Sequence, residues 1–358
     1  MEQGFSERLL NDLKKNKELV DGLIGELFPR KVDHEYLEWL LGKAKYKYDS
    51  DAINETVFKP MWDLLDRGGK RWRPWLFLTL AKCFDVKVKG YEYLATAIEL
   101  IHNGSLIADD IEDGAEVRRG DKAIHIKFGE DVAINLSSAM YFMPMRALSK
   151  VELDRDTYNR LLNAYLDDMI RIHFGQATDI GWHRGVKDPE LITEEEYMQM
   201  CANKTGVLAR LAAKFAAILA NLSDEEVDRI ANFAENIGVA FQIQDDILNI
   251  TEAEGLGKEL GEDITEGKIT LMVIYTLRKA TPEDRKRLKE ILSMKTRDRE
   301  LIAEAVEIMK KYGAIEYAKA RAREIVERSW KEVEPLLPEG ECKELLREFA
   351  YFLINRKM

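Results

Sequence analysis

Apolar residues recur at helical spacing along most of the chain, and this pattern predicts an all-α protein. The predicted helices span 91–108, 133–148, 155–175, 194–202, 206–222, 225–249 and 269–278, with further helices to the C-terminus. Only 8 prolines occur, none of them between Pro74 and Pro144 or between Pro189 and Pro282, so long helices are permitted. The apolar stripes are wide, which indicates that several helices are buried on most sides.

Glycine-containing stretches interrupt the helical pattern in two places. Gly68 and Gly69 break a helix-loop-helix pattern over 55–80, and cations gather where the second helix begins. The loop over 249–269 spaces glycines among charged residues, and we expect a mobile lid there. Its residues of interest are Gly255, Gly257, Lys258, Gly261, Asp263, Gly267 and Lys268.

The 358 residues show no linker at which the chain divides. We therefore expect one all-helical domain over 1–358, with a motif-bearing core at about 68–270. Residues 1–50 alternate charged and apolar groups at helical spacing, and we expect surface helices there that carry no chemical motif.

Composition narrows the classes of function. A net charge of −11 and a pI near 5.3 argue against general nucleic-acid binding. The three cysteines are scattered without metal-ligand spacing, as expected for reduced thiols in a cytoplasmic protein. The first residues lack the pattern of a signal peptide, and the most apolar helix, near 208–222, is interrupted by Arg210 and Lys214. No membrane-inserted segment is predicted.

Two acidic clusters, each at the end of an apolar helical run, carry the candidate chemistry. They are Asp109-Asp110-Ile111-Glu112-Asp113 and Asp245-Asp246-Ile247-Leu248-Asn249. Asp109 and Asp113 stand four apart, so their Cβ atoms lie roughly 6 Å apart on one helix face. Hard cations relieve the repulsion among such carboxylates, and magnesium commonly bridges carboxylate to phosphate. The sequence therefore predicts one magnesium site made of two halves, together with a phosphorylated ligand.

Cations near the clusters are candidates to clamp two diphosphates. As a hypothesis, one diphosphate is assigned to Lys70, Arg73, His102 and Arg119, and the other to Arg118, Lys204, Lys258 and Lys268 with the metals. Guanidinium groups suit this role because they bind phosphate oxygens in bidentate fashion. Thr205 and Gln242 would place neutral dipoles near a developing positive charge.

Plainer interpretations of the same residues stay open on the residues alone. An acidic run is ordinarily a solvated helix face, and His102 on an apolar helix is ordinarily a core histidine. The cations after Gly69, with Arg67, could instead form a nucleic-acid patch. The acidic overall charge and the paired glycines favour an anion-binding loop, and the second acidic cluster favours a metal site.

Several motifs follow one another in a specific order. They are Gly68-Gly69-Lys70-Arg71-x-Arg73-Pro74, the first acidic cluster with Arg118-Arg119-Gly120, Asn203-Lys204-Thr205-Gly206, and Phe241-Gln242-x-x-Asp245-Asp246. In this order the chain resembles the trans-prenyl diphosphate synthases. The first cluster, Gly175-Gln176-x-x-Asp179 and Thr193-Glu194-Glu195-Glu196-Tyr197 are most similar to geranylgeranyl diphosphate synthases of the eukaryotic type. The resemblance implies an isoprenoid-synthase-type helical bundle around a deep central cavity, with the acidic clusters facing across its mouth.

The resemblance also implies a reaction, the head-to-tail condensation of isopentenyl diphosphate with an allylic diphosphate. Three magnesium ions would help to withdraw the allylic diphosphate and leave a carbocation. Their ligands would be Asp109, Asp110, Asp113, Asp245 and Asp246. The catalytic residues would be Lys204, Thr205 and Gln242: the dipoles of Thr205, of Gln242 and of the backbone near Lys204 would stabilise the carbocation. The closing lid would exclude water. No side-chain base is required, because the departing diphosphate removes the proton.

Product length depends on how deep an apolar pocket runs below the first cluster. Gly104 and Ser105, one turn before Asp109, are small and leave the pocket open past the C15 stage. By resemblance, Tyr141, Phe142 and His173 form the floor, which predicts a C20 product.

Three other functions stay open beside a C20 synthase. A synthase of C15 or C25 products would share the chemistry and differ in the pocket. A terpene cyclase has no need of a second diphosphate clamp, and an inactive regulatory subunit has no need of intact metal and cation positions. A homodimer is implied by the resemblance, and Met140, Met143 and Met145 on helix 133–148 exceed what one cavity wall needs.

Overall fold

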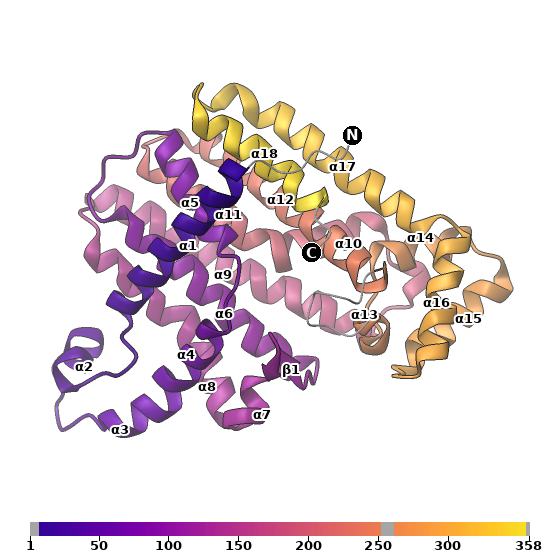
Figure 1. Ribbon diagram of the computed structural model, residues 1–358, viewed down its shortest axis with the longest axis horizontal. Helices are drawn as coiled ribbons and strands as arrows, with labels where there is room; N and C mark the ends of the chain where they lie inside the picture. Colours follow the sequence, from indigo (N-terminus) through magenta and orange to yellow (C-terminus); the bar gives the residue numbers. More distant parts are fainter. Residues whose placement is uncertain (1–6, 252–260, 356–358) are drawn as a thin grey trace. The chain divides into compact units, whose positions relative to one another are not determined.

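The computed structural model describes residues 7–251 and 261–355, and nearly all of its regular structure is helical (Figure 1). The prediction of an all-α protein is confirmed. The chain divides into two compact units, Met1–Leu162 with Phe215–Leu222, and Asn163–Lys214 with Ser223–Met358. The single domain expected from the sequence stays a prediction, and the two units are described in turn.

The first unit is built around α6 and contains a short hairpin. Its elements are α1 (Glu7–Leu27), α2 (His34–Leu41), α3 (Ser50–Ile53), η1 (Asn54–Phe58), α4 (Lys59–Asp66), α5 (Trp72–Cys83), η2 (Tyr91–Tyr93), α6 (Leu94–Glu112), β1 (Val117–Arg118), β2 (Asp121–Lys122), α7 (Ile124–Phe128), α8 (Glu130–Phe142) and η3 (Met143–Lys150). Helix α9 (Arg155–His183) begins in this unit and continues in the second, and α11 (Val207–Leu219) ends in it.

The second unit is built around α12. Its remaining elements are η4 (Pro189–Leu191), α10 (Glu194–Cys201), η5 (Ala202–Gly206), α12 (Asp224–Thr251), α13 (Glu262–Glu266), α14 (Leu271–Lys279), α15 (Pro282–Met294), α16 (Arg299–Lys311), α17 (Ala314–Val333), η6 (Glu334–Leu336) and α18 (Glu341–Asn355).

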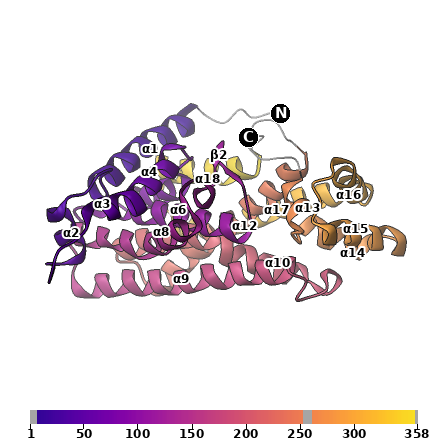
Figure 2. The ribbon, with the colours of Figure 1, turned by 90° about the horizontal axis from the view of Figure 1, so that it is seen from below.

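Helix α6 packs against α1, α5 and α8, so most of its residues are buried (Figures 1 and 2). Gly104 lets α8 approach closely, because a Cβ atom on it would lie 2.8 Å from the Cβ atom of Met140. The helix does not end before the first acidic cluster, as the sequence pattern predicted, but continues to Glu112. The backbone N–H of Asp113 still donates to the carbonyl of Asp109 at 2.9 Å, so these two carboxylates keep helical spacing.

Helix α12 lies alongside α17 over most of its length and also packs against α10, η5 and α18 (Figure 1). Its crossing with η5 is very close: a Cβ atom on Gly238 would lie 2.5 Å from the Cα atom of Gly206. A Cβ atom on Gly206 would in turn lie 2.7 Å from the carbonyl oxygen of Glu235. This crossing holds the Asn203-Lys204-Thr205-Gly206 motif against the helix that carries the second acidic cluster.

Some helix boundaries in the structure differ from those predicted from the sequence. Helix 133–148 is an α-helix only to Phe142 and continues as the 3₁₀ helix η3, which begins one residue before Pro144. Of the predicted lid, Gly255, Gly257 and Lys258 lie outside the described residues. Its described end contains the short helix α13 between Gly261 and Gly267.

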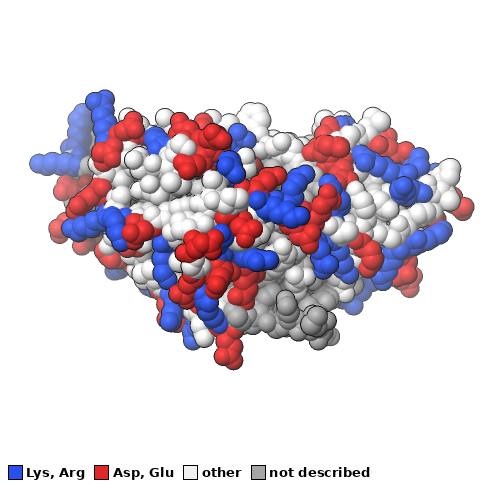
Figure 3. Space-filling model, turned by 90° about the horizontal axis from the view of Figure 1, so that it is seen from above, with Lys and Arg blue, Asp and Glu red and all other residues white. Residues whose placement is uncertain are grey.

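Acidic and basic side chains are interspersed over the face of the molecule shown in Figure 3. Among the residues that the structure describes, no helix is both long enough and apolar enough to cross a membrane.

We predict that Gly238→Ala lowers the free energy of unfolding by about 1–3 kcal/mol, because the added methyl group must push two helix backbones apart. Urea denaturation followed by circular dichroism measures this. Gly181→Ala in α9 is the matched control: no atom lies within 4 Å of its added Cβ atom. The control should gain about 0.5–1 kcal/mol from helix propensity. Equal stability of Gly238→Ala and the wild type would contradict the close crossing.

Candidate active site

The loop that contains Gly68 and Gly69 needs glycine because its backbone has positive φ angles. Gly68, Gly69 and Arg71 have φ angles of 93°, 140° and 50°, three left-handed conformations within four residues. A Cβ atom on Gly69 would lie 2.6 Å from Nη1 of Arg71. The turn brings the chain into α5, where Arg73 lies in the first turn and is buried. The preceding Lys70 is exposed.

The motif Arg118-Arg119-Gly120 forms a two-residue hairpin turn between β1 and β2. Arg119 and Gly120 have φ angles of 51° and 77°, as a type I′ turn requires. A non-glycine residue in this conformation is uncommon and costs backbone energy. Ion pairs attach the hairpin to α4, since Lys127 contacts Asp63 at 2.6 Å and Asp121 at 2.7 Å.

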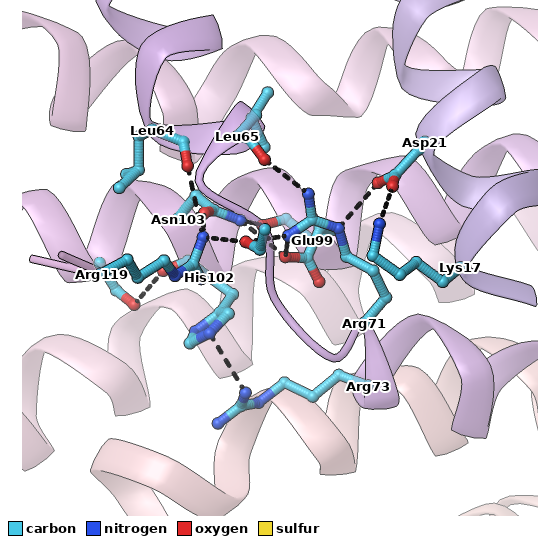
Figure 4. A network of polar contacts seen from close by, with 12 residues as sticks. Lys17, Asp21, Leu64, Leu65, Arg71, Arg73, Glu99, His102, Asn103 and Arg119 are labelled. Carbon is cyan, nitrogen blue, oxygen red and sulfur yellow. Dashed lines mark hydrogen bonds and ion pairs between the residues drawn. The ribbon is translucent and has the colours of Figure 1, made fainter. Parts of the chain in front are cut away.

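Arg73, His102 and Arg119 from three segments of the first unit lie close together (Figure 4). Nη1 of Arg73 lies 3.4 Å from Nε2 of His102. Burial, with Arg73 and Arg119 adding positive charge, holds the pKa of His102 well below its usual value, so the imidazole is neutral. Burial likewise lowers the pKa of Arg119 to about 10. We call this group the cationic wall: two guanidinium groups with a neutral hydrogen-bonding ring beside them.

The first acidic cluster separates into residues of different exposure. Asp110 is buried and accepts a hydrogen bond from Nε of Arg118 at 2.7 Å, while burial raises the pKa of this carboxyl. Asp109 and Asp113 are partly exposed. Nη2 of Arg118 also lies 3.7 Å from Oδ2 of Asp109. Two accessible carboxylates with helical spacing are hard oxygen donors, a set that suits magnesium.

In the second unit, Lys204 lies in the π-helical turn η5 and its Nζ contacts Oδ2 of Asp179 at 2.5 Å. Short π-helical turns within α-helices often occur at functional sites. Gly175 on α9 permits the close approach, because a Cβ atom there would overlap the backbone of Asn203 and Lys204. The motif residues Gly175, Asp179 and Lys204 are therefore brought together.

Thr205, Gln242 and Asp246 form a hydrogen-bonded chain. The hydroxyl of Thr205 donates to Oε1 of Gln242 at 2.7 Å, and Nε2 of Gln242 donates to Oδ1 of Asp246 at 2.7 Å. The hydroxyl of Tyr197 donates to the other oxygen of Asp246 at 2.7 Å. Burial raises the pKa of Asp246 to about 6. Both oxygens of Asp246 thus have protein partners, whereas Asp245 is partly exposed.

Asn249 and Lys268 have partners of their own. Oδ1 of Asn249 accepts a hydrogen bond from the backbone N–H of Asp263 at 3.1 Å. The assignment of the metal to Asp245 and Asp246 stays a prediction. Nζ of Lys268 lies 2.5 Å from Oε2 of Glu266. Lys258 lies outside the described residues.

The residues expected to control product length differ in exposure. Gly104 is buried against Met140, so helix packing also explains its small size. The Ser105 hydroxyl donates to the carbonyl of His102 at 2.8 Å. Tyr141 is partly buried, and burial, with Glu112 and Asp109, raises the pKa of its hydroxyl.

Phe142 and His173, the other two floor candidates, are exposed. Their role as a floor stays a prediction.

Sequence reasoning missed three residues of the first unit that hold its arginines, and it gave Tyr197 no role beyond its place in a motif. Asp21, Glu99 and Asn103 contact Arg71 or Arg119, and Tyr197 contacts Asp246. The available signal was Glu99, an acid inside an apolar run and three residues before His102. Asp21 gave no signal, because it lies in a region interpreted as surface helix.

The all-helical fold, the cationic wall and the separate acidic clusters are typical of enzymes that act on phosphorylated substrates. The model of the polyprenyl synthetase family matches residues 54–309. The short chain isoprenyl diphosphate synthase of Methanothermobacter thermautotrophicus is 38% identical over 309 residues, which cover 86% of this chain and 93% of that protein. The geranylgeranyl diphosphate synthase of Methanosarcina mazei is 31% identical over 350 residues and 98% of both chains.

A solved structure agrees. The crystal structure of geranylgeranyl pyrophosphate synthetase from Pyrococcus horikoshii matches with a TM-score of 0.81 and 30% identity over 98% of this chain and 100% of that chain. The chain belongs to the polyprenyl synthetase family, and it is a trans-prenyltransferase. The family resemblance drawn from the motifs is confirmed, and the finer likeness to the eukaryotic type stays a prediction.

We predict that His102 makes stability depend on pH. Its pKa is lowered in the folded state, so the unfolded chain binds the proton more readily as the pH falls below about 6.5. The stabilisation is present above that pH and is lost below it. Between about pH 7.5 and 5.5 the wild type should lose roughly 1 kcal/mol more unfolding free energy than His102→Gln. His34→Gln, at an exposed histidine of the same unit, should behave as the wild type; parallel pH curves for all three would contradict the prediction.

Proposed function

We propose that the chain condenses isopentenyl diphosphate with an allylic diphosphate and makes geranylgeranyl diphosphate, a C20 product. The observation that carries the proposal is the convergence of Arg73, neutral His102 and Arg119 in one wall of the first unit, beside a helix that ends in paired carboxylates. Such a wall suits a diphosphate because guanidinium groups bind its oxygens and its negative charge offsets theirs. The family and the relatives named above support the same reaction.

Isopentenyl diphosphate is assigned to Lys70, Arg73, His102 and Arg119. The left-handed turns at Arg71 and Arg119 fix the backbone on either side of these groups, so little order is lost when the diphosphate binds. Neutral His102 adds a hydrogen bond without adding to the repulsion between the two arginines. The double bond of this substrate is the nucleophile, and its diphosphate stays intact.

The allylic diphosphate is assigned to Arg118, Lys204, Lys258 and Lys268 with magnesium. Asp109, Asp113 and Asp245 are partly exposed and are the proposed ligands, whereas Asp110 and Asp246 are buried and orient neighbouring polar groups. Their predicted direct ligation therefore becomes a supporting role in our proposal. Magnesium, when bound, would neutralise charge on the leaving diphosphate. Three ions per site remain our expectation.

Thr205 and Gln242 would protect the allylic cation by turning oxygen dipoles toward it. Their hydrogen bond and the anchoring of Gln242 on Asp246 hold the dipoles in place before reaction. Preorganised dipoles cost no reorganisation at the moment of ionisation. The departing diphosphate takes up the proton that is lost as the new double bond forms.

We infer a homodimer from apolar side chains that a single chain leaves in solvent. Leu166, Ile170 and Phe174 on α9 are 46%, 59% and 69% exposed and are spaced four apart, so they share one face of the helix. Phe142 at the end of α8 is 71% exposed. Exposed apolar stripes of this kind mark interaction surfaces. The sequence led us to expect Met140 at the dimer surface with Met143 and Met145. For Met140 this expectation is wrong, because its side chain is buried inside the unit.

The same exposure bears on the product floor. A side chain that stops chain growth must be covered, and Phe142 and His173 are exposed in the single chain. A second copy of the chain is the proposed cover, with Tyr141 contributing from within. We also retain the expectation of a cytoplasmic enzyme that binds no nucleic acid and inserts no segment stably in a membrane.

We expect purified protein with magnesium and labelled isopentenyl diphosphate to elongate C5, C10 or C15 allylic diphosphates to a dominant C20 product. Chromatography of the dephosphorylated alcohols measures the chain length. A dominant C15 or C25 alcohol would keep the chemistry and refute the C20 assignment. No elongation with any primer would refute the synthase and favour a cyclase or an inactive subunit.

We expect Asp109→Ala or Asp245→Ala to reduce turnover by about 10²–10³-fold, because each removes a ligand needed to stabilise the leaving diphosphate. Removal of magnesium with a chelator should abolish turnover in the wild type, and added magnesium should restore it. Glu307→Ala, at an exposed acid of α16, is the control and should keep full activity. Wild-type turnover in both aspartate variants, with unchanged circular dichroism, would remove the metal assignment.

A further inference from the structure

A buried carboxylate lies behind the cationic wall of the first unit. Glu99 on α6 is only 2% exposed, and its Oε1 accepts a hydrogen bond from Nη1 of Arg71 at 2.8 Å. The same oxygen accepts a hydrogen bond from Nδ2 of Asn103 at 2.7 Å. A buried carboxylate is costly unless it is paired and hydrogen-bonded, and both conditions are met here.

Asn103 connects this carboxylate to Arg119. Its Nδ2 donates to Glu99, so its Oδ1 points the other way and accepts a hydrogen bond from Nη1 of Arg119 at 3.1 Å (Figure 4). The same Nη1 donates to the carbonyl of Gly68 at 2.5 Å. The Nη1 end of the Arg119 guanidinium is thereby held by neutral oxygens, and this attachment sets the direction of the remaining N–H groups.

Arg71 connects the carboxylate to the glycine loop. Its guanidinium donates to the carbonyls of Gly68 at 3.1 Å and Leu65 at 3.1 Å, as well as to Glu99. Its Nε donates to Oδ1 of Asp21 on α1 at 2.9 Å. Arg71 is therefore buried and committed to protein partners, whereas Lys70 is exposed, although both belong to one cationic motif.

We propose that Glu99 is a positioning residue for isopentenyl diphosphate: through Asn103 it orients Arg119, and through Arg71 it fixes the loop that carries Lys70 and leads to Arg73. The proposal rests on the proposed function, which assigns Lys70, Arg73 and Arg119 to this substrate. Glu99 itself touches no substrate, and its effect passes through the two hydrogen bonds at Oε1.

The physical basis is the direction of the hydrogen bonds. An ionised carboxylate can only accept, so it forces Asn103 to present its NH₂ group to Glu99 and its oxygen to Arg119. A glutamine in place of Glu99 leaves at most a neutral oxygen at the position of Oε1, so the hydrogen bonds from Arg71 and Asn103 lose the charge that strengthens them. If the glutamine amide is turned the other way, its NH₂ group opposes both donors. If the Asn103 amide turns to relieve this, its NH₂ group meets the Arg119 guanidinium, which also can only donate.

A merely structural role for Glu99 would lower stability without favouring one substrate. The discriminating readout is therefore the KM for each substrate together with kcat. Glu99→Gln should raise the KM for isopentenyl diphosphate about tenfold, while kcat and the KM for the allylic diphosphate change less than about twofold. Glu99→Asp, which keeps the charge, should recover part of the affinity.

Asp168→Asn is the matched control for loss of a buried carboxylate. Asp168 is fully buried in the second unit and pairs with Lys214 at 3.2 Å and Arg210 at 3.4 Å, neither of which is assigned to a substrate. It should lower the melting temperature as Glu99→Gln does and leave both KM values unchanged. Asp21→Asn should shift the KM for isopentenyl diphosphate less than Glu99→Gln, because Asp21 is 34% exposed and water can replace it.

Arg119→Lys separates failure of the inference from failure of the proposed function. If it raises the KM for isopentenyl diphosphate and Glu99→Gln does not, positioning by Glu99 is wrong and the substrate assignment stands. If Arg119→Lys leaves that KM unchanged, the assignment fails and the inference fails with it. In the double variant, the part of the Glu99→Gln effect that passes through Asn103 to Arg119 should vanish, and the part that passes through Arg71 should remain.

Should Glu99→Gln not fold, Asn103→Ser with Glu99→Asp gives the same test, because Asn103→Ser removes the oxygen that Arg119 contacts. A selective rise in the KM for isopentenyl diphosphate supports the proposal, and an equal change in both KM values overturns it.

Discussion

The cationic wall of the first unit depends on one constraint: positive groups that must meet a diphosphate have to be kept close together before the diphosphate arrives. Glu99 supplies the compensating charge from behind, and its hydrogen bonds to Arg71 and Asn103 leave the outer side of the wall positive. Without a buried negative charge, mutual repulsion would separate Arg71, Arg73 and Arg119. Burial makes the compensation effective, because solvent does not screen it.

The second unit has to hold carboxylates in place, and it does so with hydrogen bonds and an ion pair, as the first unit does for its cations. Here the partners are arranged around carboxylates, since Tyr197 and Gln242 hold Asp246 and Lys204 contacts Asp179. A carboxylate with two donors keeps one orientation, and the dipole of Gln242 is then fixed as well. In both units a buried acid that touches no substrate in our proposal determines where the outer polar groups point.

The sequence was sufficient for the parts of the protein that repeat a local pattern. Helical spacing predicted the positions of α6, α9, α10, α11 and α12, and the motifs predicted the family and the candidate residues. It was insufficient where a residue's role depends on a partner far along the chain. Asp21 contacts Arg71 50 residues away, and Tyr197 contacts Asp246 49 residues away. Local pattern carries no information on such pairs, because packing alone brings them together. The exposure of Phe142 likewise follows from packing and could not be read from its aromatic character.

The π-helical turn η5 determines where the residues of its motif lie, although the helices around it could form without it. Helices α10, η5 and α11 follow one another without a gap, and η5 accommodates one more residue per turn than an α-helix. Deleting one residue there would leave a segment able to form ordinary helical hydrogen bonds throughout. Every side chain on one side of the deletion would, however, rotate by about 100° relative to the other. Lys204 and Asp179, or Gly206 and Gly238, would lose register while helix content stayed the same. The number of residues in this turn is thus a requirement of the site in its own right, separate from which residues occupy the turn.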